Sequence, residues 1–106
     1  MFDAYISEIR LFGQEQLPPH WLPCDGRLLN IRDAQALYAC IGNMYGGDGT
    51  TTFALPDLRG RVPLGVNWQI RIGEQLALVS ERNEESLGTR AVTFAIATQG
   101  MFPSER

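Results

Sequence analysis

Lysine is absent from this chain of 106 residues, and the absence already excludes one class of function. All nine basic residues are arginines, and with twelve acidic residues the formal net charge is −3. Proteins that wrap nucleic acid need a clustered positive surface, so we expect no nucleic-acid partner. Arginine offers a rigid planar fork that fits carboxylates, so this composition favours fixed salt bridges over a diffuse basic surface.

Side chains that carry chemistry are scarce as well. The single histidine, His20, lies between a proline and a tryptophan and cannot complete a zinc set with the two cysteines. No serine has a Gly-x-Ser-x-Gly setting. The Gly-rich loop at 46–52 has neither the lysine of a phosphate-binding loop nor the carboxylate repeat of a calcium loop. We therefore expect no catalytic residue, no cofactor and no metal ligand, and the chain is predicted not to be an enzyme.

The two cysteines allow one intrachain disulfide. A bond between Cys24 and Cys40 would close a loop of about 15 residues and stabilise the fold by roughly 3 kcal/mol under oxidising conditions. The alternative, which we favour, is a pair of buried thiols that act as small hydrophobic side chains. The sequence leaves the pairing open.

Long apolar runs are missing too. No stretch approaches the roughly 20 apolar residues that span a bilayer, and the opening MFDAYISEIR has an acid at Asp3 and no apolar signal core. We therefore expect no membrane span and no cleaved secretory signal. With 44% hydrophobic and 20% charged residues, the chain is expected to form one globular domain over 1–106 with a single modest core.

Backbone-directing residues, by contrast, crowd into 43–65 (NMYGGDGTTTFALPDLRGRVPLG). Glycine permits positive φ and proline fixes φ, so their spacing prescribes one backbone path and excludes a regular helix. Asp57 stands close to Arg59 and Arg61 among leucines that draw the segment toward the core. Because a carboxylate in a partly buried place needs partners, we expect Asp57 to bond backbone amides or one of these arginines as a structural clamp.

Taken with Cys24-Asp25-Gly26, this run resembles the phage tail-collar domain family, which includes the microcystin-dependent proteins. The family pattern has an opening G-E-I-hydrophobic-F, then P-x-x-W-hydrophobic-x-C-D-G and a short helix, and last a YGGDG-x-TTF-x-LPDLRGR-V-P block. The corresponding segments here are 7–12 (SEIRLF), 18–26 (PPHWLPCDG) and 45–63. The ending IATQGMFPSER resembles the terminus of the microcystin-dependent subgroup. Longer members continue into a Q-L-P-x-H-x-H motif and a variable tip, so this chain resembles a short member without the distal tip.

The resemblance implies a structural subunit of a phage tail fibre or related extracellular filament, located in a virion tail or a cell-surface appendage. Its partners would be copies of itself, in a trimer or a filament, and a host-surface or appendage component. The alternative is a module that binds a cell-surface receptor or glycan, with Trp21, Trp68 and Tyr45 as stacking platforms.

The expected fold class is α+β, a small mainly-β collar-type domain with many turns and one short helix. Period-two alternation predicts a first strand from Tyr5 to Phe12 with apolar residues on both faces. Trp21 is expected to fill the core. Cys24 to Arg27 have the turn chemistry of a tight reversal, so a hairpin or a strand-turn is expected there.

One helix is predicted between Asn30 and Gly42. Asn30 is a favourable N-cap, and Gly42 is a typical C-terminal stop. The apolar spacing predicts about three turns with Leu37, Tyr38 and Ile41 on the buried face.

Beyond Gly65 the local pattern alone guides the prediction. The alternation of Trp68, Ile70 and Ile72 indicates a short strand, and 73–88 is expected to be a solvated loop with four glutamates. A last strand over 91–97 and a turn at 99–103 close the chain. The domain thus divides into a family-matching core (7–66), a divergent loop (67–90) and a closing strand (91–103).

Structural roles are predicted for residues that set turns, pair charges or fill the core, namely Trp21, Cys24, Asp25, Gly26, Gly46, Gly47, Asp48, Gly49, Phe53, Pro56, Asp57, Arg59, Gly60, Arg61 and Pro63. An assembly interface is predicted where apolar strand and terminal residues would be costly to leave in water. Its residues are Tyr5, Ile6, Ile9, Phe94, Ile96, Met101 and Phe102.

Overall fold

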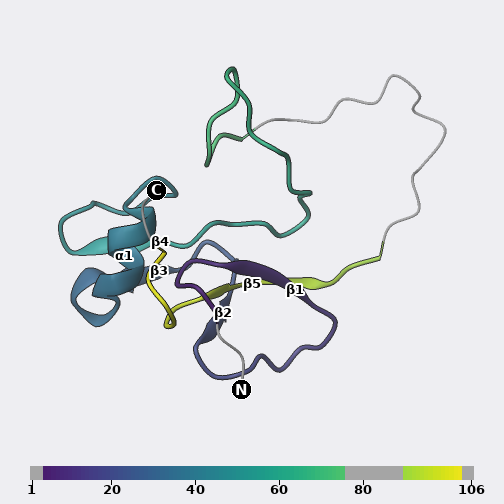
Figure 1. Ribbon diagram of the computed structural model, residues 1–106, viewed down its shortest axis with the longest axis horizontal. Helices are drawn as coiled ribbons and strands as arrows, with labels where there is room; N and C mark the ends of the chain where they lie inside the picture. The colour runs from purple at the N-terminus through teal and green to yellow at the C-terminus, as the bar shows by residue number, and fades with distance from the viewer. Residues whose placement is uncertain (1–3, 76–89, 104–106) are drawn as a thin grey trace.

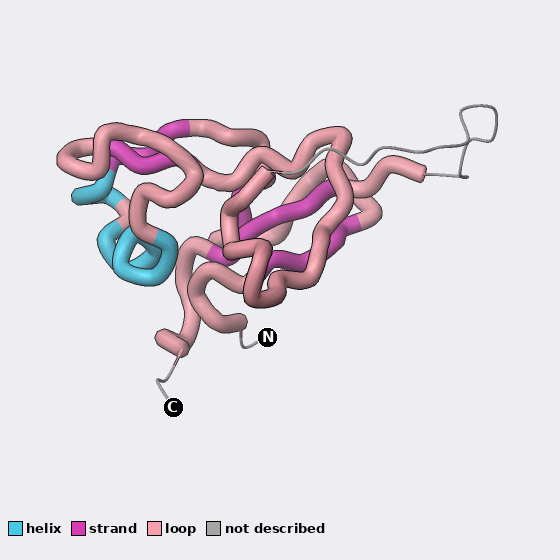
Figure 2. The backbone as a smooth tube through the Cα atoms, turned by 90° about the horizontal axis from the view of Figure 1, so that it is seen from above, coloured by secondary structure: helices cyan, strands magenta, loops and turns pink. Residues whose placement is uncertain are grey.

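The computed structural model describes residues 4–75 and 90–103, which form two small antiparallel sheets and one short helix (Figure 1). The three-stranded sheet has the order β1-β5-β2 and the two-stranded sheet the order β3-β4. The strands are β1 (Ile9–Phe12), β2 (Trp21–Pro23), β3 (Leu28–Asn30), β4 (Thr52–Ala54) and β5 (Thr93–Ala97). Loops make up most of the described chain, as Figure 2 shows. The domain is therefore mainly β, as the sequence predicts.

The last strand, β5, is the centre of the larger sheet. It pairs with β1 on one side, where Ile9 faces Ile96, and with β2 on the other, where Trp21 faces Ala97. Ala95, Ile96 and Ala97 are fully buried. Both edges of the predicted closing strand are therefore already hydrogen-bonded.

The first strand is shorter than predicted, since β1 begins at Ile9 and not at Tyr5. Ser7 has φ 77°, and the amide of Glu8 donates to the carbonyl of Tyr5 at 3.0 Å, which closes a turn. The amide of Ser7 donates to the carbonyl of Ala97, and the amide of Ala97 donates to the carbonyl of Glu8, each at 2.9 Å. Ser7 and Glu8 thus lie opposite the single residue Ala97, which is a β-bulge, and the regular pairing of β1 with β5 ends there.

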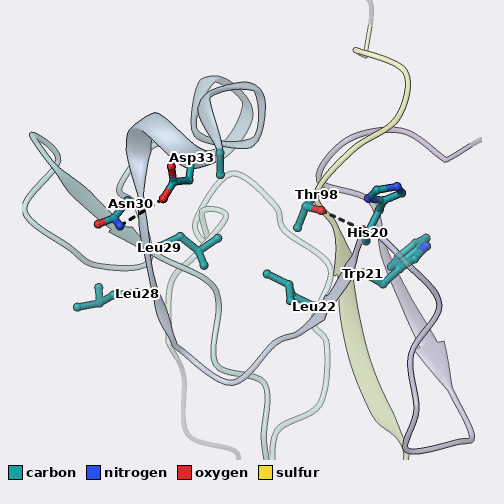
Figure 3. Close-up of a pocket in the computed structure, with 9 residues that line it drawn as sticks. His20, Trp21, Leu22, Leu28, Leu29, Asn30, Asp33 and Thr98 are labelled. Carbon is teal, nitrogen blue, oxygen red and sulfur yellow. Dashed lines mark hydrogen bonds between the residues drawn. The ribbon is translucent and has the colours of Figure 1, made fainter.

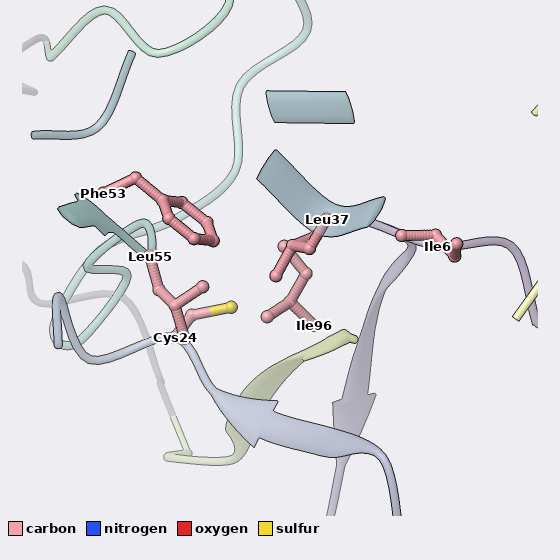
Figure 4. Packing of buried hydrophobic residues seen from close by; sticks show 6 residues of the cluster. All are labelled: Ile6, Cys24, Leu37, Phe53, Leu55 and Ile96. Carbon is pink, nitrogen blue, oxygen red and sulfur yellow. The ribbon is translucent and has the colours of Figure 1, made fainter. Parts of the chain in front are cut away.

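The core lies between the two sheets and the helix (Figure 4). Its buried members are Ile6, Cys24, Leu37, Phe53, Leu55 and Ile96. The assignment of Ile6 and Ile96 to an assembly interface is therefore wrong, because their exposed fractions are 5% and 0%.

Trp21 lies half-buried on the outer face of the larger sheet, so the expectation that it fills the core is also wrong. On this face its ring packs edge-on against Phe12, with centroids 5.2 Å apart, and the guanidinium of Arg10 lies 5.3 Å from its centroid. Because side chains alternate along a strand, Leu22 turns to the inner face and packs against the core in its place.

The predicted helix is broken into two pieces. A 3-10 turn, η1 (Ile31–Asp33), precedes α1 (Gln35–Ile41), and Ala34 between them has φ −145°. The Asn30 side chain makes no capping bond to the backbone and instead donates to Asp33 at 3.4 Å. Leu37 is fully buried and Tyr38 and Ile41 pack partly buried against the core, so the predicted face is correct although the helix has two turns.

The predicted turn at 24–27 is present with Gly26 at φ 80°, and it leads from β2 in one sheet to β3 in the other, so it is a strand-turn and not a hairpin. A further prediction differs from the structure. Residues 68–72 form a turn and not a strand, because Asn67 and Ile70 exchange backbone hydrogen bonds of 3.1 and 3.2 Å. Most of the predicted loop at 73–88 lies outside the described residues. Cys24 and Cys40 are free thiols, Cys24 buried and Cys40 half-buried.

Candidate assembly surface and its structural loops

Two loops from distant parts of the sequence lie side by side, and we call residues 24–27 and 55–59 the paired loops. Asp25 and Asp57 form an isolated β-bridge. The amide of Gly26 donates to the carbonyl of Pro56 at 3.2 Å, and the amide of Leu58 donates to the carbonyl of Cys24 at 2.9 Å. The buried neighbours Cys24 and Leu55 fasten this pairing to the core.

Each paired loop carries the same Asp-x-Arg ion pair. The Nε and Nη2 atoms of Arg59 donate to the two carboxylate oxygens of Asp57, each at 2.8 Å. The equivalent bonds from Arg27 to Asp25 are 3.1 and 2.9 Å. The expected bond between Asp57 and an arginine is therefore present as a two-pronged pair with Arg59.

This clamp lies at the surface, contrary to the expected partial burial. The side chain of Arg59 is 70% exposed, because Leu55 and Pro56 turn inward and leave the charges outside. The side-chain hydrogen bond from Arg59 lowers the pKa of Asp57 to about 2. Exposed pairs of this kind contribute little to stability. Arg61 has no carboxylate within salt-bridge distance among residues 4–75 and 90–103, although it was expected to pair.

The loop at 46–52 is closed around Asp48. Its Oδ1 accepts the amides of Thr50, Thr51 and Thr52 at 2.8 to 2.9 Å, and its Oδ2 accepts the Thr51 hydroxyl at 2.8 Å. These bonds, led by that from the Thr52 amide, hold the pKa of Asp48 far below its usual range. The carboxylate is thus engaged by its own loop, and the arrangement stabilises a turn.

Gly47 brings this loop against β4. A Cβ atom at Gly47 would lie 2.5 Å from the Cα of Phe53 and 2.7 Å from the carbonyl oxygen of Thr52. Since both are backbone atoms, no side-chain rotation relieves the contact. The tyrosine hydroxyl of Tyr38 donates to the carbonyl of Gly49 at 3.1 Å and ties the loop to the helix.

Further polar features of the described residues are the Cys24 thiol, the Asn30–Asp33 pair and His20. Burial raises the pKa of the Cys24 thiol to about 12, which keeps it protonated. A pocket of about 460 Å³ lies between β2 and β3 (Figure 3), where Asn30 and Asp33 bond to each other. Figure 3 shows the His20 and Trp21 side chains directed away from that pair. Within the described residues no group of three or more His, Cys, Asp or Glu side chains could hold a metal ion.

The apolar residues predicted for assembly divide into exposed and buried sets. Tyr5, Met101 and Phe102 are each about half-exposed, and Tyr5 forms a parallel bridge with Met101. We call these three residues the end patch. Ile9 is 39% exposed on the edge strand β1, and Phe94 is half-buried beside it.

The structure exposes a larger apolar surface that the sequence analysis did not predict. Residues 61–75, which we call the arm, expose Val62, Leu64, Val66, Trp68 and Ile72. Between the arm and β1 lies a cleft of about 1150 Å³, whose lining includes Leu11, Leu58 and Phe94. The alternation of apolar residues from 62 to 72 is the sequence signal for this surface. The prediction of a short strand rests on 68–72 alone, the last part of that alternation.

The fold and these loops define a class, a small mainly-β domain in which Asp25, Asp48 and Asp57 each bond within their own loop. The chain belongs to the phage tail collar domain family, since the family model described as Phage Tail Collar Domain matches residues 7–63, more than half of the chain. This family consists of structural phage tail components, which implies a place in a virion tail. The match includes the paired loops and the Asp48 loop and ends at residue 63, within the first residues of the arm.

Comparison of the chain with curated proteins and with solved structures found no match. Among the described helices, none has the length and hydrophobicity to cross a bilayer.

Proposed function

We propose that this chain is a non-catalytic structural subunit of a phage-tail-fibre-like or other extracellular appendage, and that it works by associating with copies of itself. The main observation that supports this proposal is the exposed end patch. Tyr5, Met101 and Phe102 are 49%, 48% and 57% exposed; Tyr5 forms a parallel β-bridge with Met101, and Phe102 is the next residue along the chain. Exposed apolar residues that gather at one place mark an interaction surface.

The end patch is held in a defined shape. The amide of Met101 donates to the carbonyl of Ala4 at 2.8 Å, and the amide of Ile6 donates to the carbonyl of Met101 at 2.9 Å. Ile6 anchors this pairing in the core. An ordered apolar surface loses little conformational entropy on binding, which favours association.

The edge strands supply a second means of association. β1 and β2 are the outer strands of the larger sheet, so each has one side free of partners within the described residues. Strand addition by another chain would satisfy the backbone groups on those sides. Ile9, on β1, would then gain a cross-strand neighbour on the added strand.

Sedimentation equilibrium over a micromolar concentration range tests the proposal. We expect species heavier than the 11.8 kDa monomer, and Phe102→Asp should shift the distribution toward the monomer. Leu28→Asp is the matched control, because Leu28 is equally exposed but lies on β3, outside the end patch and its chain-end pairing. A wild-type protein that stays at 11.8 kDa throughout would rule the proposal out.

A receptor- or glycan-binding module is the second candidate, and the exposure of Trp68 favours it. Trp68 is 88% exposed, so its ring could stack on a sugar. Trp21 offers less, because Arg10 covers its ring, and Tyr45 is half-buried. A glycan array in which wild-type protein binds and Trp68→Ala does not would support this function, and an array without hits would leave it unsupported.

A further inference from the structure

The arm has the apolar pattern of a strand but lies uncovered. Every second residue from 62 to 72 is apolar, which is the pattern of a strand with one buried face. Among these residues, only Ile70 is half-buried, and the others are 53% to 88% exposed. The arm forms no strand pair with the described residues. It therefore presents an apolar surface that residues 4–75 and 90–103 leave in water.

The tip of the arm is ordered. Backbone hydrogen bonds of 3.1 and 3.2 Å join Asn67 and Ile70, and the Asn67 side chain accepts the amides of Gln69 and Ile70 at 2.8 and 2.9 Å. This turn holds Trp68 outward, 88% exposed. Figure 1 shows the segment that follows β4 rising away from β1 and β5. A large aromatic side chain on a fixed turn is a preorganised anchor.

The cleft is the complementary feature of the same chain. Leu11 lies on the inner face of β1, two residues along from Ile9, which pairs with the buried Ile96. Even so, Leu11 is 59% exposed, because the cleft of about 1150 Å³ opens beside it. The core is thus unfilled at this edge. Trp68 does not line the cleft of its own chain.

We infer that the arm tip, with Trp68, seats in the cleft of a second copy of this chain, between Leu11 and the arm of that copy. The inference rests on the proposed self-association and names the surfaces that carry it. One chain holds both the projecting anchor and the apolar receptacle, so contacts between copies can satisfy both. The cleft lining also includes Arg61 and Arg71, and an arginine over an indole is a favourable contact that Arg10 and Trp21 already make in this fold.

The size of the uncovered surface agrees with an interface between copies. Trp68 and the half-exposed aliphatic residues of arm and cleft would remove roughly 500 Å² of apolar surface per chain from water. A stable interface buries about 800 Å² per partner, of which about 60% is apolar. The two apolar areas are of the same size.

Disulfide trapping between two singly substituted chains tests the contact. Gln69→Cys, which keeps Trp68, and Leu11→Cys are placed in separate chains that also carry Cys40→Ser, and the chains are mixed under mild oxidation. Each chain then has one accessible thiol, since Cys24 is buried, so the mixed dimer reports only contacts between copies. Leu28→Cys replaces Leu11→Cys as the control, because Leu28 is 60% exposed and lies outside the cleft.

We expect the Gln69→Cys and Leu11→Cys pair to form the mixed dimer well above the Leu28→Cys control. In sedimentation equilibrium, Trp68→Ala should raise the dissociation constant about tenfold or more. Circular dichroism checks that the variants are folded. An oligomeric wild type without selective trapping, whose dissociation constant Trp68→Ala leaves unchanged, would overturn this inference and leave the proposed function standing. A monomeric wild type would overturn both.

Discussion

Gly47→Ala is the substitution for which the structure predicts the sharpest loss of stability. Gly47 has φ 92°, and its missing Cβ is the space that the backbone of β4 occupies. The built Cβ would lie 2.5, 2.7 and 2.9 Å from the Cα of Phe53, the carbonyl oxygen of Thr52 and the amide nitrogen of Phe53. To relieve these contacts β4 would have to move, and with it the fully buried ring of Phe53.

Two other glycines separate the causes of that loss. Gly60 has φ 68° but nothing within 4 Å of its built Cβ, so Gly60→Ala should cost only the left-handed conformation, about 1 kcal/mol. Gly65 has neither a positive φ nor a close neighbour, so Gly65→Ala should be neutral or slightly stabilising. Gly47→Ala adds a backbone displacement of about 1 to 3 kcal/mol to the conformational cost, which gives a total of about 2 to 4 kcal/mol.

Urea unfolding followed by circular dichroism measures the series. All variants must be compared at one protein concentration, because association adds concentration-dependent stability. A loss of about 2 to 4 kcal/mol is a large part of the 5 to 15 kcal/mol that a domain usually has. If Gly47→Ala and Gly60→Ala lowered the free energy of unfolding equally, the close approach of Gly47 to β4 would be refuted.

Three further predictions concern the bulge, the carboxylates and the core. Ser7→Gly should stabilise the domain by about 1 kcal/mol in the same urea assay, because Ser7 has φ 77°, and an unchanged midpoint would contradict that strain. The pKa values of Asp48 and Asp57 are lower in the folded state than in the unfolded chain, where an aspartate has a pKa of about 4. The contribution of these carboxylates to the free energy of unfolding is therefore complete above about pH 4 and is lost as the pH falls toward 2. Melting temperatures from pH 7 to 2 should show this fall, and Asp48→Asn should flatten it, whereas an equal slope in wild type and variant would count against the role of Asp48. Leu37→Ala should cost about 2 to 5 kcal/mol in urea unfolding, since Leu37 is fully buried, and a loss below about 1 kcal/mol would mean that the helix does not close the core.

The paired loops show which contacts can be predicted from residues close together in the sequence. Asp57 and Arg59 are two residues apart, so their ion pair depends on a short turn that the neighbouring proline and glycine already direct. The meeting of this loop with Asp25 could not be derived in the same way. It depends on Leu55 and Cys24 sharing one core, and only the folded chain brings them together.

The strands show which features cannot be predicted from residues close together in the sequence. An apolar stretch near the C-terminus predicts a strand, but it cannot show whether that strand is central or at an edge, because the backbone partners are up to about 90 residues away. The predicted locations of Ile6 and Trp21 were wrong for a similar reason: Ile6 was expected at an interface and is buried, and Trp21 was expected in the core and lies on the outer face of the sheet. The bulge at Ser7 redirects the chain so that Ile6 points inward, whereas the register of β2 places Trp21 on the outer face.

The sequence by itself determined the family, the turns and the Asp-x-Arg pairs of this chain, because glycine, proline and closely spaced charges act over a few residues. Tertiary structure alone decided which apolar residues are buried and which remain exposed for partners. Burial depends on contacts between distant segments, and the arm and the end patch stay exposed because the described part of the chain has no further segment that covers them.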